Sequence, residues 1–416
     1  MNRRISTVVG SFLALAACSS SPNDTTTGTA VTTAVESTTT AVAASESTST
    51  TTTTPESALL SDSRLSPISA LANPNECKIA DITPSDKQPE LTSGFPRSEL
   101  GADPLEDLKL LVVPVSVSDS VFDDSDVVIV QEMLDFATKF YEHQSYGKVT
   151  INATIAPRES WVTLPGTADS TGMTDLTPLD DKTQIYLDAL MASANTLDLA
   201  AFDMVAVYTH KDDRFYFGQA FESVDTPDGP VPTGVLIGGK TVTLWTVLAH
   251  EIGHSWLLSE DLYYFPDQSQ IMMGGWDLMA QPIAITIELS PWLRWINGWL
   301  SDDQVRCITA PGETVHFLET ISKPSNLTKM SVVKLSDHSA LVVDSRRQGE
   351  FGVDGYDSNG DATIVYVVDT SIAHGQGPIR WRGELRTVGD SLTTDGVTIT
   401  LLEADDTSDL VSIVVG

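Results

Sequence analysis

The residues best suited to chemistry lie in one stretch of the chain, residues 242–263, whose centre reads HEIGH at positions 250–254. Two histidines four positions apart in a helix project from the same face, one turn apart, so His250 and His254 can bind one metal ion. Zinc accepts neutral imidazole nitrogens, and a catalytic zinc site keeps one position open for water. Glu251 would accept a proton from that water as it attacks a carbonyl group. The pattern therefore predicts a zinc hydrolase.

The surrounding sequence predicts that these residues lie on a buried helix. Apolar side chains recur in steps of three and four at Trp245, Leu248, Ile252 and Trp256, which turns one helix face inward. The alternatives are a surface His/Glu pair or histidines satisfied within an ordinary core. Buried Glu and His normally need a partner, and a metal ion would supply one.

A third protein ligand would complete the usual three plus water, and the nearest candidates are Glu260 and Asp261. Here the stretch resembles the M6 family of metallopeptidases, the immune inhibitor A group, which shows H-E-x-G-H followed by a glycine and then D-x-Y. The sequence matches at 250–254 and again at 261–263, which reads DLY. It differs in having Leu257 or Leu258 at the glycine position and one residue more before the aspartate. The resemblance implies Asp261 as the third zinc ligand, with Glu260 as the alternative.

Further segments resemble the same family. Residues 271–279, IMMGGWDLM, are similar to the Met-turn that lies below the zinc, which implies that Met279 packs beneath the metal as an apolar floor. An ordinary core methionine is the alternative. Residues 140–148 and 298–300 also resemble the family, so the similarity runs from about Lys109 to Leu300.

The N-terminus predicts export and lipidation. Residues 1–17 combine a basic start with a short apolar run, and Leu15-Ala16-Ala17-Cys18 resembles a lipobox, in which the Cys18 thiol is acylated. An ordinary secretory signal is the alternative. Residues 18–70, rich in Ser and Thr, are expected to form a disordered linker. The apolar run is too short to span a bilayer, so we expect a protein of the cell envelope, outside the cytoplasm and anchored to the membrane by lipid alone.

With Cys18 lipidated, Cys77 and Cys307 remain, in a compartment that permits disulfides. A bridge between them would tie the start of the folded region to the segment that follows the catalytic half. The competing hypothesis is that Cys77 binds the zinc in a latent form.

Residues 71–303 are expected to form the catalytic domain. Alternating strand and helix patterns indicate an α/β (α+β) unit, which the resemblance makes zincin- or metzincin-like. The expected strands are 109–115, the segment leading to Ile151, and 203–208; the expected helices are 124–143, 180–195 and one that starts at Pro291 with Ser290 as N-cap. His143 and His210 are interpreted as satisfied residues, not ligands, because neither has a partner at metal-binding spacing.

Residues 304–416 are expected to form a smaller all-β, sandwich-like domain. Its expected strands are 314–317, 330–334, 340–343, 362–368, 397–402 and 410–415. Residues 354–361 concentrate oxygen ligands in a spacing that suggests Ca²⁺, although a solvated acidic turn is the preferred interpretation.

The charge balance, 57 acidic against 24 basic residues, disfavours nucleic acid as a partner, because phosphate binding needs clustered Lys and Arg. We expect a monomer that acts on protein or peptide substrates. The sequence thus predicts a membrane-tethered, zinc-dependent endopeptidase with Glu251 as general base. The alternative is an inactive protease-fold lipoprotein that serves as a binding module. A zinc hydrolase of non-peptide substrates is a third, smaller possibility, because the motif does not fix what the activated water attacks.

Overall fold

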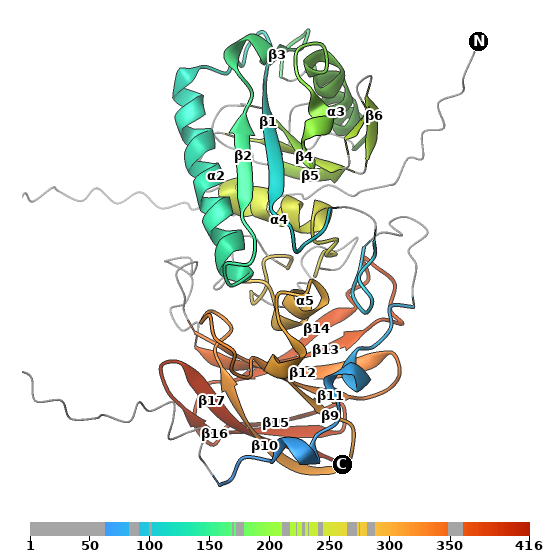
Figure 1. Ribbon diagram of the computed structural model, residues 1–416, viewed down its shortest axis with the longest axis vertical. Coiled ribbons are helices and arrows are strands. Elements are labelled where there is room, and N and C mark those ends of the chain that lie inside the picture. The colour runs from blue at the N-terminus through green and yellow to red at the C-terminus, as the bar shows by residue number, and fades with distance from the viewer. Residues whose placement is uncertain are drawn as a thin grey trace, which may run out of the picture.

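A computed structural model describes most of the chain after residue 62. The described residues are 63–82, 91–99, 102–168, 170–171, 179–209, 217–221, 223–226, 229–231, 233–239, 244–263, 273, 275–280, 288–347 and 361–416. The predicted signal peptide, the lipidated Cys18 and most of the linker lie outside them, as do His210 and residues 354–360 of the proposed calcium loop. An α/β region forms one end of the molecule and a β region the other (Figure 1).

The α/β region is built on a largely parallel sheet with the strand order β2-β1-β4-β8-β5, and β3 pairs with the far end of β1. Only β5 runs antiparallel to its neighbour. The strands are β1 (Leu108–Ser116), β2 (Ile151–Ile155), β3 (Val162–Thr163), β4 (Met204–Thr209), β5 (Phe217–Phe221) and β8 (Thr233–Gly238); a separate hairpin joins β6 (Val224–Thr226) and β7 (Gly229–Val231).

Helices cover both faces of this sheet, which is why its central strands β1 and β4 are almost wholly buried and mainly apolar. Residues such as Leu110 point toward α2 (Asp124–Gln144) and α4 (Trp245–Ser255), whereas Leu111 points toward α3 (Leu179–Ser193). A capping box at Asp123 starts α2: the Asp123 carboxylate accepts a hydrogen bond from Ser125 N at 2.7 Å. Helices α2 and α4 pack against each other on the same face of the sheet, α2 over β2 and α4 over β5 and β8.

The β region consists of two sheets packed face to face around a shared apolar core. Their strands are antiparallel except for β9, which runs parallel to β11. One sheet has the order β10-β17-β16-β15 and the other β14-β13-β12-β11-β9. The strands are β9 (Val305–Ile308), β10 (Gly312–Glu319), β11 (Met330–Lys334), β12 (Ser339–Arg346), β13 (Ala362–Asp369), β14 (Ile379–Leu385), β15 (Ser391–Thr394), β16 (Val397–Ala404) and β17 (Ser408–Val415). The predicted order, an α/β region followed by antiparallel β sheets, is confirmed.

The two regions share one continuous core. Val332 and Val342 on one face of the five-stranded sheet belong to the same apolar cluster as the α4 residues, whereas Val333 and Val343 on the other face pack against the second sheet. Between the regions lies α5 (Pro291–Ile296), which the Ser290 N-cap begins as predicted (Figure 1). The β region is therefore packed onto the metal-motif half and is not suspended from it by a linker.

The first described residues also belong to the β region. Residues 63–70, placed in the linker by the sequence, contain the 3₁₀ turn η1 (Ile68–Ala70), and Ser66 N donates to Val315 O at 3.0 Å. The next turn, η2 (Pro74–Cys77), carries Cys77, which forms a disulfide with Cys307 on β9 (S–S 2.07 Å). The predicted bridge is thus present, and Cys77 is not a metal ligand. Other 3₁₀ turns within the described residues are η3 (Arg158–Ser160), η4 (Leu199–Ala201) and η6 (Asp302–Gln304).

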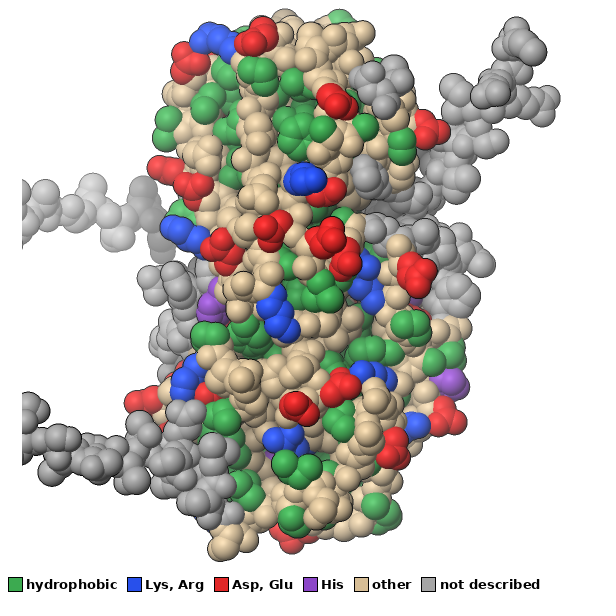
Figure 2. All heavy atoms as spheres, viewed as in Figure 1, with side chains coloured by type: hydrophobic (Ala, Val, Ile, Leu, Met, Phe, Trp, Pro, Cys, Tyr) green, Lys and Arg blue, Asp and Glu red, His purple; other side chains and the backbone are tan. Residues whose placement is uncertain are grey.

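Within the described residues, no helix is both long and apolar enough to cross a membrane. On the face shown in Figure 2, Lys and Arg side chains are scattered among acidic ones and do not gather into a basic patch.

Candidate metal centre

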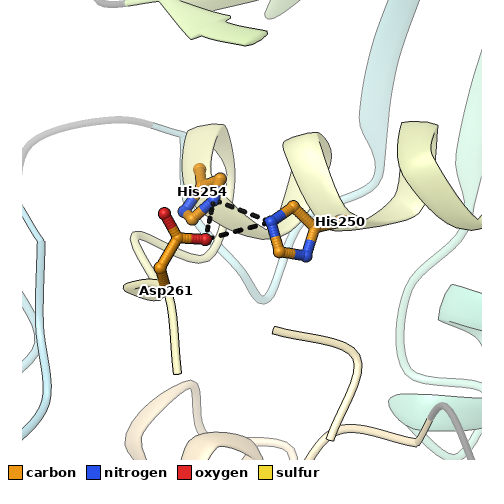
Figure 3. A group of neighbouring side chains, drawn as sticks. All are labelled: His250, His254 and Asp261. Atoms are coloured by element: carbon orange, nitrogen blue, oxygen red, sulfur yellow. Dashed lines mark hydrogen bonds and ion pairs between the residues drawn. The ribbon is translucent and has the colours of Figure 1, made fainter. Parts of the chain in front are cut away.

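The structure brings together the three side chains that the sequence singled out as ligands. His250 and His254 project from the same face of α4, and Asp261 reaches them from the segment after the helix (Figure 3). His250 Nε2 and His254 Nε2 are 3.1 Å apart, and each is 3.1 Å from Asp261 Oδ1. A tetrahedral zinc ion with bonds of about 2.0–2.1 Å separates its ligand atoms by about 3.3 Å. The three atoms could therefore hold one metal ion.

Backbone carbonyl groups orient both imidazoles. His250 Nδ1 lies 3.0 Å from Leu278 O, and His254 Nδ1 lies 2.7 Å from Ser259 O. Because a carbonyl oxygen only accepts hydrogen bonds, each Nδ1 carries a hydrogen, and in the neutral imidazole each Nε2 then has a lone pair that can bind a metal ion. Such outer contacts fix the tautomer and the direction of a metal-binding histidine.

Three acceptor atoms that face one another need a positive charge between them, and the electrostatics of the cluster show this need. Burial lowers the pKa of His254, but the charge and hydrogen bond of Asp261 outweigh burial and raise it to about 9. Burial alone would raise the pKa of Asp261, yet the two imidazoles hold it well below its ordinary value. A divalent cation would supply the same charge with better geometry, so the residues fit the metal that the sequence predicts.

The two candidates for the third ligand point in different directions. Asp261 faces the histidines, whereas the carboxylate of Glu260 accepts a hydrogen bond from His374 Nδ1 in the loop between β13 and β14. Burial raises the pKa of Glu260 to about 7, although His374 opposes this shift. The geometry therefore assigns the ligand position to Asp261 and a contact with the β region to Glu260.

The chain reverses direction just after α4 so that Asp261 can return to the histidines. Leu258 adopts a left-handed backbone with φ of 54°, and it occupies one of the two positions where the family pattern has glycine. This conformation costs a non-glycine residue about 1 kcal/mol or more. Leu258 is almost fully buried, which offsets that cost with apolar contacts.

Met279 is buried and packs against α4 at Gly253, so its predicted role as an apolar floor beneath a metal ion stays a prediction. A Cβ at Gly253 would lie 2.6 Å from Met279 Sδ, so the helix can approach the methionine only because this position has no side chain. Buried Asp277 fixes the turn, since its carboxylate accepts from Met279 N at 2.9 Å and from Ser290 N at 2.7 Å. Neighbouring Met272 and Gly274 lie outside the described residues.

Glu251 is buried on α4 close to the edge strand β5. A Cβ at Gly218 of β5 would lie 2.4 Å from Glu251 Oε1, so this glycine gives the carboxylate its space. Among the described residues, no hydrogen bond reaches Oε1. Burial raises the pKa of Glu251, and the nearby His250 and His254 partly oppose that shift. A buried carboxylate with an oxygen that no described residue satisfies, next to a possible metal site, is the kind of group that perturbed pKa values mark as a functional candidate.

Several neighbours of the site were not assigned a role from the sequence. Tyr263 hydrogen-bonds to Asp261, and its ring lies parallel to that of His250 with centroids 6.4 Å apart. Lys182 on α3 is buried, and its charge acts on Glu251. For Tyr263 the DLY motif was a usable signal. For Lys182, as for Gly218 and His374, only the fold reveals the proximity.

Of the two other histidines considered from the sequence, His210 lies outside the described residues and His143 is not part of the cluster. His143 Nε2 lies 3.0 Å from Glu288 Oε1, which agrees with its interpretation as a satisfied residue.

Comparison with known proteins gives no family assignment: no protein-family model matches the chain, and no curated protein is significantly similar to it. The resemblance to M6 peptidases therefore stays a prediction.

Proposed function

We propose that this chain is a zinc-dependent endopeptidase. The observation that carries the proposal is the convergence of His250, His254 and Asp261 around one point, with Glu251 on the same helix. When bound, zinc would polarise a carbonyl group and make water acidic enough to lose a proton near neutral pH. The chain itself supplies three oriented metal-ligand atoms, from His250, His254 and Asp261, and the buried carboxylate of Glu251.

Glu251 would act as the proton carrier of the reaction. Its Oε1, to which no described residue donates a hydrogen bond, could accept the proton of the attacking water and return it to the leaving amine. A carboxylate whose pKa is raised by burial holds a proton more readily than an exposed one, which suits both halves of this exchange. The tight fit against Gly218 would keep the carboxylate from turning away.

The position of β5 supports a peptide as substrate. This strand ends the sheet, and no other described strand pairs with its outer edge. An unpaired edge offers backbone N–H and C=O groups to an extended peptide, which can add as a further strand. Gly218 places this edge directly beside Glu251, so a peptide bound there would lie next to the proton carrier.

The decisive test is casein hydrolysis by the full chain and by Glu251→Gln, each with and without a chelator. We expect the variant to keep its zinc and lose about 10²- to 10⁴-fold in rate, because only the proton carrier is removed. The chelator should abolish the remaining activity. If all samples, including the zinc-loaded native chain, leave casein intact, the proposal is wrong and a binding module becomes the better hypothesis.

We also propose that the chain is exported and anchored through lipid on Cys18. The support is the sequence of residues 1–18 alone. Cys18→Ser should move the protein from the detergent-rich to the aqueous phase in a phase-separation assay. A native chain that already partitions into the aqueous phase would contradict the anchor.

A further inference from the structure

The loop that carries the third ligand is tied to the β region by a buried pair of side chains. Glu260 immediately precedes Asp261, and its carboxylate accepts a hydrogen bond from His374 Nδ1, 114 positions later in the chain. Both side chains are at most 2% exposed. On its other side, His374 Nε2 lies 3.8 Å from Asp81 Oδ2, so the imidazole sits between two carboxylates.

Burial makes this contact hard to break. A buried carboxylate without a partner is costly, and among the described residues no hydrogen bond reaches the second oxygen of Glu260. His374 is thus the group that compensates its charge. If the loop moved outward, Glu260 and His374 would both lose a partner in a poorly hydrated place. The pair therefore fixes where residue 260, and with it residue 261, can lie.

The β region reaches the floor of the metal centre as well. Arg346 Nη1 on β12 donates to Trp276 O at 3.0 Å, in the turn that leads to Met279. Leu262 N donates to Met279 O at 2.9 Å, which links that floor to the loop carrying Asp261. The loop and the floor are thus both connected to the same five-stranded sheet.

We propose that His374 is a positioning residue of the metal centre: by pairing with Glu260, it holds Asp261 against His250 and His254. The β region would then complete the site and not merely follow it. This inference rests on the three proposed zinc ligands, but not on the reaction that the bound metal serves.

The test measures zinc affinity of the folded full-length protein by competition with a chromophoric chelator. We expect His374→Ala to weaken zinc binding about 10- to 100-fold, the usual effect of losing an outer partner of a metal ligand. His374→Gln, which keeps an N–H donor, should recover most of the affinity. His338→Ala is the control, because His338 lies in the β11–β12 hairpin of the same sheet and its Nδ1 makes no hydrogen bond among the described residues.

A double-mutant cycle separates positioning from general stability. If Glu260 and His374 act as one unit, Glu260→Ala/His374→Ala should bind zinc no more weakly than the worse single variant. Native zinc affinity in folded His374→Ala, or additive losses in the double variant, would overturn the inference. If His374→Ala does not fold, Glu260→Ala decides the question: it removes the other half of the contact and should weaken zinc binding by a similar factor, and native affinity in folded Glu260→Ala would overturn the inference.

The outcomes also distinguish this inference from the proposed function. A native chain that binds zinc but does not cleave peptides would refute the peptidase and leave the positioning role intact. A native chain that binds no zinc would overturn both.

Discussion

The two regions of the molecule treat buried charge differently. In the β region, buried charges are matched within the chain: Arg346 pairs with Asp344, Arg347 with Asp409, and Lys329 with Glu319. In the α/β region, the metal-motif cluster gathers acceptor atoms that face one another, next to a carboxylate oxygen that no described residue satisfies. These described pairs of the β region need no added ion, whereas the cluster on α4 has the arrangement of a possible metal site.

Two histidines, His316 buried and His254 largely so, show the same contrast. Burial, aided by the charge of Arg306, lowers the pKa of His316 on β10 to about 4, so this side chain stays neutral. At the metal centre, Asp261 overcomes burial and raises the pKa of His254 to about 9. Burial alone thus does not determine the charge of a histidine; the neighbouring group does.

The largest expected effect is the breaking of a matched pair in the β region. Arg346→Met leaves Asp344 buried without its partner, and we expect it to lower the free energy of unfolding by about 3–5 kcal/mol. Urea denaturation measures this loss. Asp344→Leu/Arg346→Met removes both charges and should cost clearly less than the single change; an equal or larger cost would show that the pair is not the source of the effect.

The second prediction concerns the zinc affinity of the candidate metal centre. Asp261→Ala should weaken zinc binding at least about a hundredfold, because each ligand of a tightly bound zinc contributes about 3 kcal/mol. Glu260→Ala should have a smaller effect, since this side chain faces His374. Added zinc should raise the melting temperature of the native chain but not that of Asp261→Ala. A greater loss in Glu260→Ala would reverse the ligand assignment.

The third prediction concerns the pH dependence of stability that the buried, neutral His316 should cause. In the unfolded chain an ordinary histidine takes up a proton below about pH 6.5, whereas in the folded state the pKa of His316 is about 4. Stability should therefore fall as the pH is lowered through this window, by up to about 3 kcal/mol.

His316→Gln should flatten this part of the pH profile, and His338→Ala should not. Urea unfolding at pH 7 and pH 4.5 measures the difference for each variant. Identical slopes in the native chain and in His316→Gln would show that His316 is not kept neutral by burial.

The smallest expected effect tests the contact beneath α4. Alanine normally stabilises a helix relative to glycine by up to about 1 kcal/mol. At Gly253 the new Cβ would meet Met279 Sδ at 2.6 Å, so we expect Gly253→Ala to destabilise by about 1–3 kcal/mol instead. Thermal unfolding gives the sign directly, and a stabilised variant would mean that Met279 yields without cost.

The sequence predicted the elements whose patterns are strong and local. The 3.6-residue period gave α2 and α4, and the apolar runs gave β1, β4 and the six strands expected after residue 304. Strands with weaker sequence signals were missed. β8 is a brief apolar run between glycines, and β14 mixes Arg380 and Arg382 with Trp381 around an irregular pairing.

At the candidate site, the sequence predicted the contacts that follow from helical spacing, such as those of His250 with His254. It left Glu260 and Asp261 as alternatives, because adjacent residues differ only in the direction that the loop gives their side chains. Contacts between residues far apart in the chain could not be predicted from the sequence. Nothing local in the sequence relates His374 to Glu260, and the shared core of the two regions depends on which face of a sheet meets α5.

The covalent link between Cys77 and Cys307 encloses the whole metal-motif half in a ring, with the two cysteines 230 positions apart. A single cut by any protease inside that ring opens it but releases no fragment. A nicked molecule would keep its full mass until the disulfide is reduced, and its pieces would stay side by side. The ring thus protects the assembly of the metal centre against backbone cleavage as well as against unfolding.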